Sequence, residues 1–571
     1  MESSWILKPE GDAAVVNKLM HELNVSKPIA TMLVQRGIST FEEAKRFFRP
    51  ELEHLHDPFL MADMDKAVER LNQAIKSKEK ILIYGDYDVD GTTSVALVYS
   101  FLRKKAKNID YYIPDRYNEG YGISYKGIDF AAENNFDLVI ALDCGIKAVD
   151  KIDYANKKNI DFIICDHHTP GEKIPDALAV LDPKRNDCNY PYKELSGCGV
   201  GFKLLQAYTQ QNSGSFDELY SYLDIVAISI ASDIVPITGE NRVLAFYGLK
   251  ELNKTKKEGL KAIIEVAGLK DKKIIISDCV FKIGPRINAA GRIESGRSAV
   301  KLLISEDKEP AEQFSKDIND FNFTRQGLDR NITEEAMQMI ENNEEWKSHK
   351  ATVLYKEDWH KGVVGIVASR IIEHYYKPTI VLTKSKGMAT GSARSVDGFD
   401  LYAAIDACSD LLESFGGHKH AAGLTMKIEN IEKFRSRFNE VVASMITREQ
   451  QIPKIEIDAK LSFKEITPKF FNIIRQFAPF GPGNMTPIYV TEHVMDTGFT
   501  RAVGNEQTHL QLNIKDDSNV RMKGIAFGIA QKYLPEIKKN KSFDICYSIE
   551  ENEWQGNVSL QLMVREIKIN G

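Results

Sequence analysis

The sequence lacks the features that mark membrane, secreted and disulfide-built proteins. No run approaches the roughly 20 apolar residues that span a bilayer. The start, MESSWILKPEGD, has neither the basic region nor the apolar core of a secretion signal. The 7 cysteines include no CxxC pair, which fits neither a disulfide framework nor a thiolate zinc site. No GxxxxGK[ST] loop is present, so an ATP-driven motor is not expected. These absences predict a cytoplasmic protein without membrane association.

The composition is that of an ordinary globular chain. Of the 571 residues 43% are apolar and 27% are charged. At roughly 150 residues per domain, this length predicts three or four domains. Lys+Arg number 75 and Asp+Glu 81, which gives a net charge of −6. Any affinity for nucleic acid must therefore come from a local basic groove and not from the bulk charge.

Strand-like and helical segments alternate in the first half of the chain. Four runs with continuous apolar stretches lie at 80–87, 137–145, 161–168 and 177–184. Such runs are typical of parallel strands that are buried on both faces, and their alternation with helices predicts a doubly wound α/β sheet. A long polar helix is expected between about 300 and 345, then a second α/β block, and finally short strands that favour an OB-like β-barrel.

These patterns predict a chain of five regions. They are a helical arm that packs on the next domain (1–50), a catalytic α/β domain (51–245), a linking helical region (246–345), a second α/β domain (346–450) and an OB-fold-like nucleic-acid-binding domain (451–571).

Acidic and imidazole side chains follow three of the expected strands. The set comprises Asp86, Asp88, Asp90, Asp143, Asp166, His167 and His168. Because the carboxyl ends of parallel strands line one crevice, these groups should converge. Carboxylates gathered in a medium of low dielectric constant would repel one another by several kcal/mol, and divalent cations relieve that repulsion. Oxygen ligands with one or two imidazoles favour Mn²⁺ or Mg²⁺ over zinc, and we expect two ions.

Asp233 is a further candidate ligand. It ends the apolar helix LDIVAISIAS, shortly before Pro236. Taken alone, Asp233 would be a solvated helix end, and His167 alone would be a satisfied core histidine. The DxDxDG and DHH segments together are hard to explain by packing.

Several ordered motifs resemble one known family. GDYDVDG, ALDCG, CDHH and ASDIVP resemble, in this order, the four motifs of the DHH phosphoesterase superfamily. GSARS (391–395) and GGHKHAAG (416–423) resemble its DHHA1 companion domain. GPRINAAGRI (284–293) and FAPFGPGN (477–484) resemble segments of the bacterial RecJ branch. Together the motifs cover the chain from about 80 to 490, and the ordered set is far more specific than the three letters DHH.

The resemblance implies an activity and a metal site. The activity is metal-dependent 5′→3′ hydrolysis of single-stranded DNA to mononucleotides, in DNA repair and recombination. The implied partners are a RecQ-type helicase and a single-strand-binding protein, and a monomer is expected. The implied metal ligands are Asp86, Asp88, Asp90, Asp143, His167 and Asp233. His168 and Asp143 would be catalytic, with His168 touching the scissile phosphate or orienting the attacking water. One departure is Tyr84, where related phosphatases carry a histidine, so that one ion would bind more weakly or recruit Asp86.

The resemblance also implies binding residues for the DNA. Arg116, Ser392 and Arg394 would bind a terminal 5′ phosphate, and Gly416, Gly417 and His418 would approach a phosphate closely. Arg286, Asn288 and Arg292 would line the path of the strand. Read without the family, each motif has a structural explanation as a surface arginine, a tight turn or a solvated loop.

Four alternatives remain open at this point. Within the superfamily, a nanoRNase-type oligonucleotide phosphodiesterase or a cyclic-dinucleotide phosphodiesterase would be a shorter chain without the terminal barrel, or would carry membrane and sensory segments. An inorganic pyrophosphatase would not need the additions that suit a DNA channel. A non-catalytic single-strand-binding scaffold would have lost ligands that this sequence retains.

Overall fold

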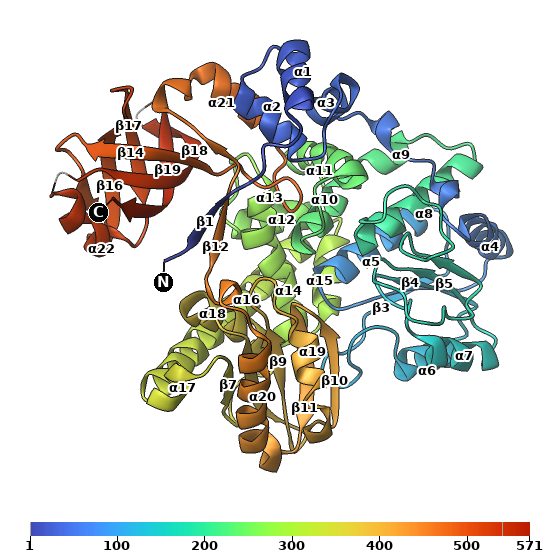
Figure 1. The fold of residues 1–571 in the computed structure, drawn as a ribbon. Coiled ribbons are helices and arrows are strands. Elements are labelled where there is room, and N and C mark those ends of the chain that lie inside the picture. Colours follow the sequence, from blue (N-terminus) through green and yellow to red (C-terminus); the bar gives the residue numbers. More distant parts are fainter. Residues whose placement is uncertain (1, 540, 555, 571) are drawn as a thin grey trace. The chain divides into compact units, whose positions relative to one another are not determined.

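The computed structural model describes residues 2–539, 541–554 and 556–570 (Figure 1). The outer limits of the first and last expected regions, residues 1 and 571, lie outside this part. The chain forms two compact units. One consists mainly of Asp57–Asp233 and Gly248–Pro453, and the other contains Trp5–His56, Ile234–Tyr247 and the chain from Lys454 onward. In the described residues no helix is both long and apolar enough to cross a membrane.

A five-stranded, all-parallel sheet forms the first half of the larger unit. Its order is β3 (Ile109–Tyr112), β2 (Ile81–Gly85), β4 (Leu138–Leu142), β5 (Asp161–Cys165) and β6 (Ala179–Leu181). Strands β2, β4 and β5 have almost fully buried side chains, which explains their continuous apolar sequences. The sequence did not indicate β3, because this edge strand is half-exposed and reads IDYY.

Helices cover both faces of this sheet. On one face, α5 (Val89–Leu102) and α8 (Gly197–Gln211) pack on the strands, with α4 (Met64–Ser77) and α10 (Leu223–Ser232) packed beside them. On the other, α6 (Tyr125–Glu133) and α7 (Val149–Lys157) share a buried core with the strands. The predicted doubly wound fold is therefore confirmed. Strand order changes direction between β2 and β4, which is where such sheets place their ligand crevice.

A helical region follows the sheet. Its elements are α9 (Asp217–Tyr220), α11 (Gly239–Leu252), α12 (Glu258–Val266), α13 (Ile276–Asp278), a π-helical turn (Cys279–Ile283), α14 (Gly284–Ile293) and α15 (Gly296–Leu303). The long helix α16 (Lys308–Glu341) then runs for 34 residues, past α12, α14 and α15 and on to α17 (Glu344–Ser348) and α18 (Val364–Tyr375). The predicted long linking helix is confirmed.

A second sheet follows α16 in the same unit. Its order is β10 (Ser414–His418), β11 (Ala421–Met426), β9 (Met388–Arg394), β8 (Thr379–Ser385) and β7 (Thr352–Tyr355). Only β7 and β8 are parallel, and the other pairs are antiparallel. One face packs on α16 and α18, and the other on α19 (Leu401–Asp406) and α20 (Ile431–Met445). The second block is α/β, as predicted.

The smaller unit is built on an antiparallel-rich sheet. Its strands are β13 (Ala459–Lys460), β14 (Tyr489–Asp496), β15 (Arg501–Val503), β16 (His509–Lys515), β17 (Arg521–Ala526), β18 (Phe543–Trp554) and β19 (Asn557–Ile569). Strand β14 pairs with β18 and also with β16, so five strands close on themselves in the order β14-β18-β19-β17-β16. This arrangement fits the predicted OB-like fold.

The N-terminal helices share the core of this smaller unit. The helices α1 (Ala13–Leu23), α2 (Lys27–Val34) and α3 (Phe41–Phe48) bury apolar residues together with the strands and with α21 (Pro468–Arg475) and α22 (Ala530–Ile537). Strand β1 (Ser4–Leu7) pairs with β12 (Lys454–Ile457). Residues 1–50 were expected to pack on the next domain. Their helices share this core with a segment that is distant in sequence, and Phe47 also contacts Arg242, whose guanidinium donates to its carbonyl oxygen.

Candidate active site

The acidic residues and His167 meet at the carboxyl edge of the parallel sheet. His167 Nε2 lies 3.1 Å from Asp143 Oδ1, 3.6 Å from Asp233 Oδ2 and 3.8 Å from Asp90 Oδ2. The other ring nitrogen, Nδ1, is 3.0 Å from the carbonyl oxygen of Leu195, to which it donates. That hydrogen bond leaves Nε2 as the nitrogen with a free lone pair, as in a metal-binding histidine.

Three buried atoms of this cluster lack a hydrogen-bond partner within the described residues. They are Asp86 Oδ2, Asp143 Oδ1 and His167 Nε2. Buried acceptors without a donor cost free energy, and all three can offer a lone pair to a cation. Two groups of ligand atoms lie within 4.8 Å of one another, one in Asp143, His167 and His168, and the other in Asp90, His167 and Asp233. The donor set, carboxylate oxygens with imidazole nitrogens, fits Mn²⁺ or Mg²⁺.

The electrostatics of the cluster also call for a cation. Burial, followed by the charges of Asp90 and Asp88, raises the pKa of Asp233 to about 9 and raises the pKa of Asp143 well above its usual range. Burial and Asp88 likewise raise the pKa of Asp86. Without a cation, these carboxyl groups tend to keep their protons near neutral pH. A divalent ion would displace those protons, which makes its affinity dependent on pH.

Helix N-termini hold two of the carboxylates in place. Asp88 caps α5, where its Oδ1 accepts a hydrogen bond from Gly91 N at 2.9 Å. Asp90, in the first turn of α5, accepts hydrogen bonds from Gly197 N and Cys198 N at the start of α8 and from Ser229 Oγ, at 2.6, 2.9 and 2.6 Å. These donors hold the two carboxyl groups in position at the helix N-termini.

Asp143 adopts an unusual backbone conformation. Its φ is 59°, in the left-handed region that non-glycine residues seldom occupy. Its N–H donates to the carbonyl of Cys165 at the end of β5, at 2.8 Å. The chain therefore turns sharply after β4, and strain of this kind is characteristic of functional sites.

His168 forms a chain of hydrogen bonds with Asp166 and Tyr121. Its Nδ1 is 2.8 Å from Asp166 Oδ1, and its Nε2 is 3.1 Å from the Tyr121 hydroxyl. Although burial opposes the shift, the hydrogen bond to Asp166 raises the pKa of His168 to about 9. Against burial, His168 in turn lowers the pKa of Asp166 to about 2. The result is a cationic imidazole at the edge of the acidic cluster. The sequence placed Asp166 among the converging acidic groups without an individual role, and it did not reveal Tyr121.

Tyr84 does not point toward the acidic cluster. Its ring belongs to the core on the α6 and α7 side of the sheet, and its centroid is 5.4 Å from that of Tyr112. The hydroxyl donates to the carbonyl of Gly122 at 2.9 Å and accepts from Ser124 N at 3.1 Å. Gly122 N in turn donates to Asp86 Oδ1 at 3.3 Å. Tyr84 thus anchors the loop that borders the cluster and is not placed as a ligand.

Ser392 and Arg394 lie beside the start of helix α18. Arg394 Nη1 donates to Ser392 Oγ at 2.7 Å. A Cβ placed on Gly365, in the first turn of α18, would stand 2.9 Å from Arg394 Nη2 and 3.1 Å from Ser392 Oγ. The first N–H groups of a helix and a guanidinium group both favour an anion, so their proximity forms a phosphate-binding arrangement.

The glycine-rich hairpin extends this surface. In the strand register, Ser392 is level with Gly423 and Gly416, and Arg394 is level with Ala421 and His418. Residues on one level share a face of the sheet, so Gly416 and His418 lie on the face of Arg394. A Cβ on Gly416 would meet open space. Gly417 is out of phase, and its Cβ would stand 2.3 Å from the Ala421 carbonyl, so it faces away from the surface that the sequence assigned to it.

Arg292 and three further arginines act on one another electrostatically and are called the arginine series below. Arg116 and Arg394 were predicted from the sequence, and Arg325 was not. Arg292 Nη1 donates to Gly362 O at 2.8 Å, and Arg116 lies 4.8 Å from the Tyr87 ring. Burial, followed by the charges of Arg116, Arg325 and Arg394, lowers the pKa of Arg292 to about 10. Arg325, on α16, was hidden in a helix with polar residues on most faces.

Arg286 and Asn288 lie on α14 close to this series. Arg286 donates to Lys282 O and Asn319 Oδ1, at 2.7 and 3.0 Å, and the Oδ1 of Asn288 is buried without a described partner. Within the described residues, Arg286 and three members of the series, Arg116, Arg292 and Arg394, form no ion pair with a carboxylate. Unneutralised arginines that lie close together are suited to a polyanion.

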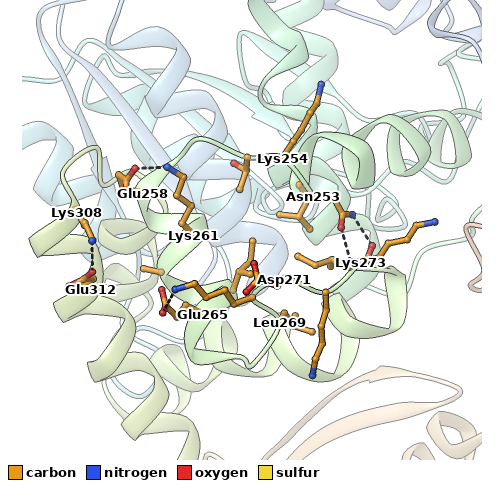
Figure 2. Close-up of a pocket in the computed structure, with 17 residues that line it drawn as sticks. Asn253, Lys254, Glu258, Lys261, Glu265, Leu269, Asp271, Lys273, Lys308 and Glu312 are labelled. Carbon is orange, nitrogen blue, oxygen red and sulfur yellow. Dashed lines mark hydrogen bonds and ion pairs between the residues drawn. The ribbon is translucent and has the colours of Figure 1, made fainter. Parts of the chain in front are cut away.

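A separate cavity of about 740 Å³ lies among α11, α12 and α16 (Figure 2). Four of its six lysines pair with acidic neighbours, among them Lys261 with Glu258 and Lys270 with Glu265, at 2.7 and 2.8 Å. None of the predicted site residues lines it. The cavity therefore has no part in the chemistry of the acidic cluster.

Comparisons with known proteins agree with this geometry. The model of the DHH family, N-terminal domain, matches residues 80–230, that of the DHHA1 domain matches 348–444, and that of the RecJ OB domain matches 457–566. A relative from Bacillus subtilis, the single-stranded-DNA-specific exonuclease RecJ, is 38% identical over 568 residues, which cover 99% of this chain and 70% of the relative. The chain belongs to the RecJ family.

Further members of the RecJ family match over similar lengths. The protein of the same name from Escherichia coli is 32% identical, and the match covers 94% of this chain and 95% of the relative. The crystal structure of RecJ from Thermus thermophilus in complex with Mn²⁺ has a TM-score of 0.85 at 25% identity, and covers 99% of this chain and 79% of that one. The family and the fold expected from the sequence motifs are thereby confirmed.

Proposed function

We propose that the protein is a metal-dependent 5′→3′ exonuclease that hydrolyses single-stranded DNA to mononucleotides. The observation that carries the proposal is the convergence of buried, unpartnered acceptors in Asp86, Asp143 and His167 at one edge of a parallel sheet. Its RecJ relatives bear the name single-stranded-DNA-specific exonuclease. Repair and recombination are the processes in which such an enzyme would act.

The acidic cluster is the proposed metal centre. Its ligands are Asp86, Asp88, Asp90, Asp143, His167 and Asp233, and two Mn²⁺ or Mg²⁺ ions fit the donor set. When bound, such ions supply a nucleophilic water at neutral pH and neutralise charge on the phosphate. The protein's own residues hold the ligand atoms in position. The imidazolium of His168, which Asp166 stabilises, would donate a hydrogen bond to the scissile phosphate.

The second sheet is the proposed binding site for the 5′ end. Arg394, Ser392 and the start of α18 would bind the terminal phosphate, with Arg116 and His418 nearby. The series of arginines without carboxylate partners then offers a path for the phosphates that follow. A terminal phosphate bound in this way would select the 5′ end of the strand.

The setting of the enzyme is also a proposal. We place it in the cytoplasm as a monomer that works with a RecQ-type helicase, which would supply single strands, and with a single-strand-binding protein. The family models at residues 348–444 and 457–566 support separate DHHA1 and OB domains within the proposed limits 346–450 and 451–571. The OB domain would bind the strand by stacking and by its basic side chains.

An assay with end-labelled substrates tests this proposal. Single-stranded DNA, duplex DNA and short RNA oligomers would each be incubated with Mn²⁺, Mg²⁺ or a chelator. We expect mononucleotides from the 5′ end of single-stranded DNA, with either ion and not with the chelator. Preferred digestion of the short RNA would support the nanoRNase alternative, and DNA binding without products would support the scaffold.

A ligand variant locates the activity. Asp143→Ala should abolish release of mononucleotides while DNA binding largely remains, and His168→Ala should do the same. Asp150→Ala, an exposed acid on α7 that pairs with Lys151, is the matched control and should keep full activity. Full activity in Asp143→Ala would contradict the placement of the site.

A further inference from the structure

Two phenylalanines near the arginine series are unusually exposed. The exposed fraction is 75% for Phe281 and 57% for Phe323. Phe281 lies in the π-helical turn Cys279–Ile283, a rare conformation that occurs most often at functional sites. Phe323 lies on helix α16, which packs against α14 (Figure 1). Single exposed apolar residues are common, but two large exposed rings on elements that pack together are candidates for a binding surface.

Arg286 joins the two elements that carry these phenylalanines. Its guanidinium donates to the carbonyl oxygen of Lys282 at 2.7 Å and to Asn319 Oδ1 at 3.0 Å. Phe281 directly precedes Lys282 in the chain. Phe323 follows Asn319 by one helical turn on the same face of α16, a rise of about 6 Å. The two elements that carry the phenylalanines, the π-helical turn and α16, therefore both supply acceptors to the same guanidinium.

The charge around Arg286 indicates what the partner must be. In the described part of the chain, Arg286 has only uncharged oxygens as partners, and the neighbouring Lys282 is already paired with Asp278 at 2.8 Å. Burial and the nearby Arg325 lower the pKa of Arg286. Arg325 also acts on Arg292, so Arg286 continues the arginine series. An anionic partner that also presents flat apolar surfaces fits this combination.

We propose that Phe281 and Phe323 are stacking platforms for the bases of single-stranded DNA, with Arg286 between them as the contact to the phosphate backbone. The inference rests on the proposed function and extends it to a specific binding step. Aromatic rings interleaved with basic groups bind single strands without regard to sequence, because every base has a flat face. Duplex DNA hides its bases in the stack and would gain nothing from these rings.

The experiment measures binding and turnover separately. The double variant Phe281→Ala/Phe323→Ala would be compared with the wild type for affinity to a fluorescent dT20 in the presence of chelator, and for Mn²⁺-dependent hydrolysis of dT20 and of a 5′-phosphorylated dinucleotide. Loss of two stacking contacts should weaken dT20 binding by about tenfold or more. Hydrolysis of the dinucleotide should remain unchanged, and so should the affinity for a duplex.

Matched variants separate stacking from folding. Phe281→Trp/Phe323→Trp should keep the dT20 affinity of the wild type, whereas Phe281→Leu/Phe323→Leu should not. Phe41→Ala removes a ring on α3 that is 44% exposed and should have no effect. Crosslinking of a dT20 that carries 5-iododeoxyuridine should label peptides with Phe281 or Phe323. Unchanged dT20 affinity in the alanine variant, or rescue by leucine as complete as by tryptophan, would overturn the inference. A wild-type protein that degrades no single-stranded DNA would instead overturn the proposed function.

Discussion

Gly197 lies so close to Asp143 that no larger residue fits at position 197. A Cβ on Gly197 would stand 2.6 Å from both the Cβ and the Oδ1 of Asp143. The same glycine begins α8 and donates its N–H to Asp90 Oδ2 at 2.6 Å. One backbone position thus makes room for one proposed ligand and orients another.

Substitution of this glycine should damage the metal site without unfolding the protein. In Gly197→Ala, the methyl group must displace the Asp143 carboxylate, so we expect Mn²⁺ affinity and nuclease activity each to fall by about 10-fold to 100-fold, as displaced metal-site groups usually cost. Isothermal titration with Mn²⁺ and the end-labelled assay measure the two effects. Gly199→Ala is the control on the same helix, because its Cβ would meet Leu195 at an ordinary 3.4 Å. Equal Mn²⁺ affinity in both variants would contradict the role of Gly197.

The stability of the metal-free protein should depend on pH in a specific direction. The pKa of Asp233 is raised to about 9 in the folded state, and that of Asp143 is also raised well above the usual 3.8. A raised carboxyl pKa adds stability below the unfolded value near 4, and this contribution is lost as the pH rises toward 9. Bound cations replace the protons, so their stabilising effect should grow over the same range.

Thermal melts would measure this effect. The rise in Tm produced by saturating Mn²⁺, relative to chelator, should increase from pH 5 to pH 8. Asp143→Asn removes one titrating ligand and should flatten the dependence, whereas Asp150→Asn, on the surface of α7, should leave it as in the wild type. A Tm shift that decreases with rising pH would contradict metal binding by the acidic cluster.

Arg394 should determine the preference for a phosphorylated 5′ end. Its guanidinium and Ser392 lie at the start of α18, where a phosphate would gain charge-assisted hydrogen bonds. Arg394→Ala should lower kcat/KM on 5′-phosphorylated DNA by about 10-fold to 100-fold, the cost of a lost hydrogen bond to a charged group. Activity on 5′-hydroxyl DNA should change little. Arg437→Ala, which removes an exposed arginine paired with Asp410, is the control. Equal losses on both substrates would exclude this pocket.

Local sequence patterns predicted those parts of the structure that depend on single elements. The buried strands β2, β4 and β5 gave continuous apolar runs, and Asp86, Asp143 and His167 followed them directly, so sheet geometry alone brought them together. Asp233 needed the packing of α10 beside α5, which no local pattern contains.

Long-range packing explains what the sequence did not reveal. The N-terminal helices bury their apolar faces against strands that follow more than 400 residues later, and the periodicity of a helix does not name its partner. The sequence assigned no role to Arg325 or Tyr121. Their roles follow from the effect of the Arg325 charge on the pKa of Arg292 and from the 3.1 Å contact between the Tyr121 hydroxyl and His168 Nε2. The face of the sheet on which Gly417 lies depends on the register of the β10–β11 hairpin. A shift of that register by one residue would move every side chain to the opposite face.

Tyr84 provides a last test, because the sequence suggested a weakened ligand position there and the structure gives it another role. Its buried hydroxyl holds Gly122 and Ser124, in the loop that carries Arg116 and Tyr121. Tyr84→Phe leaves two buried backbone groups without their partner, so we expect a loss of about 1–3 kcal/mol in the free energy of unfolding. The KM for DNA should rise, because the loop is less well held. Mn²⁺ affinity should stay within about twofold of the wild type, since the hydroxyl is not aimed at the cluster.

The control for this variant is Tyr154→Phe. It removes a hydroxyl that donates to Asp129 Oδ1 at 2.8 Å on the surface of α7 and should change none of the three quantities. Urea unfolding, steady-state kinetics and Mn²⁺ titration measure them independently. A large loss of Mn²⁺ affinity in Tyr84→Phe with an unchanged free energy of unfolding would mean that this hydroxyl turns toward the ions, and the loop-anchoring role would then be wrong.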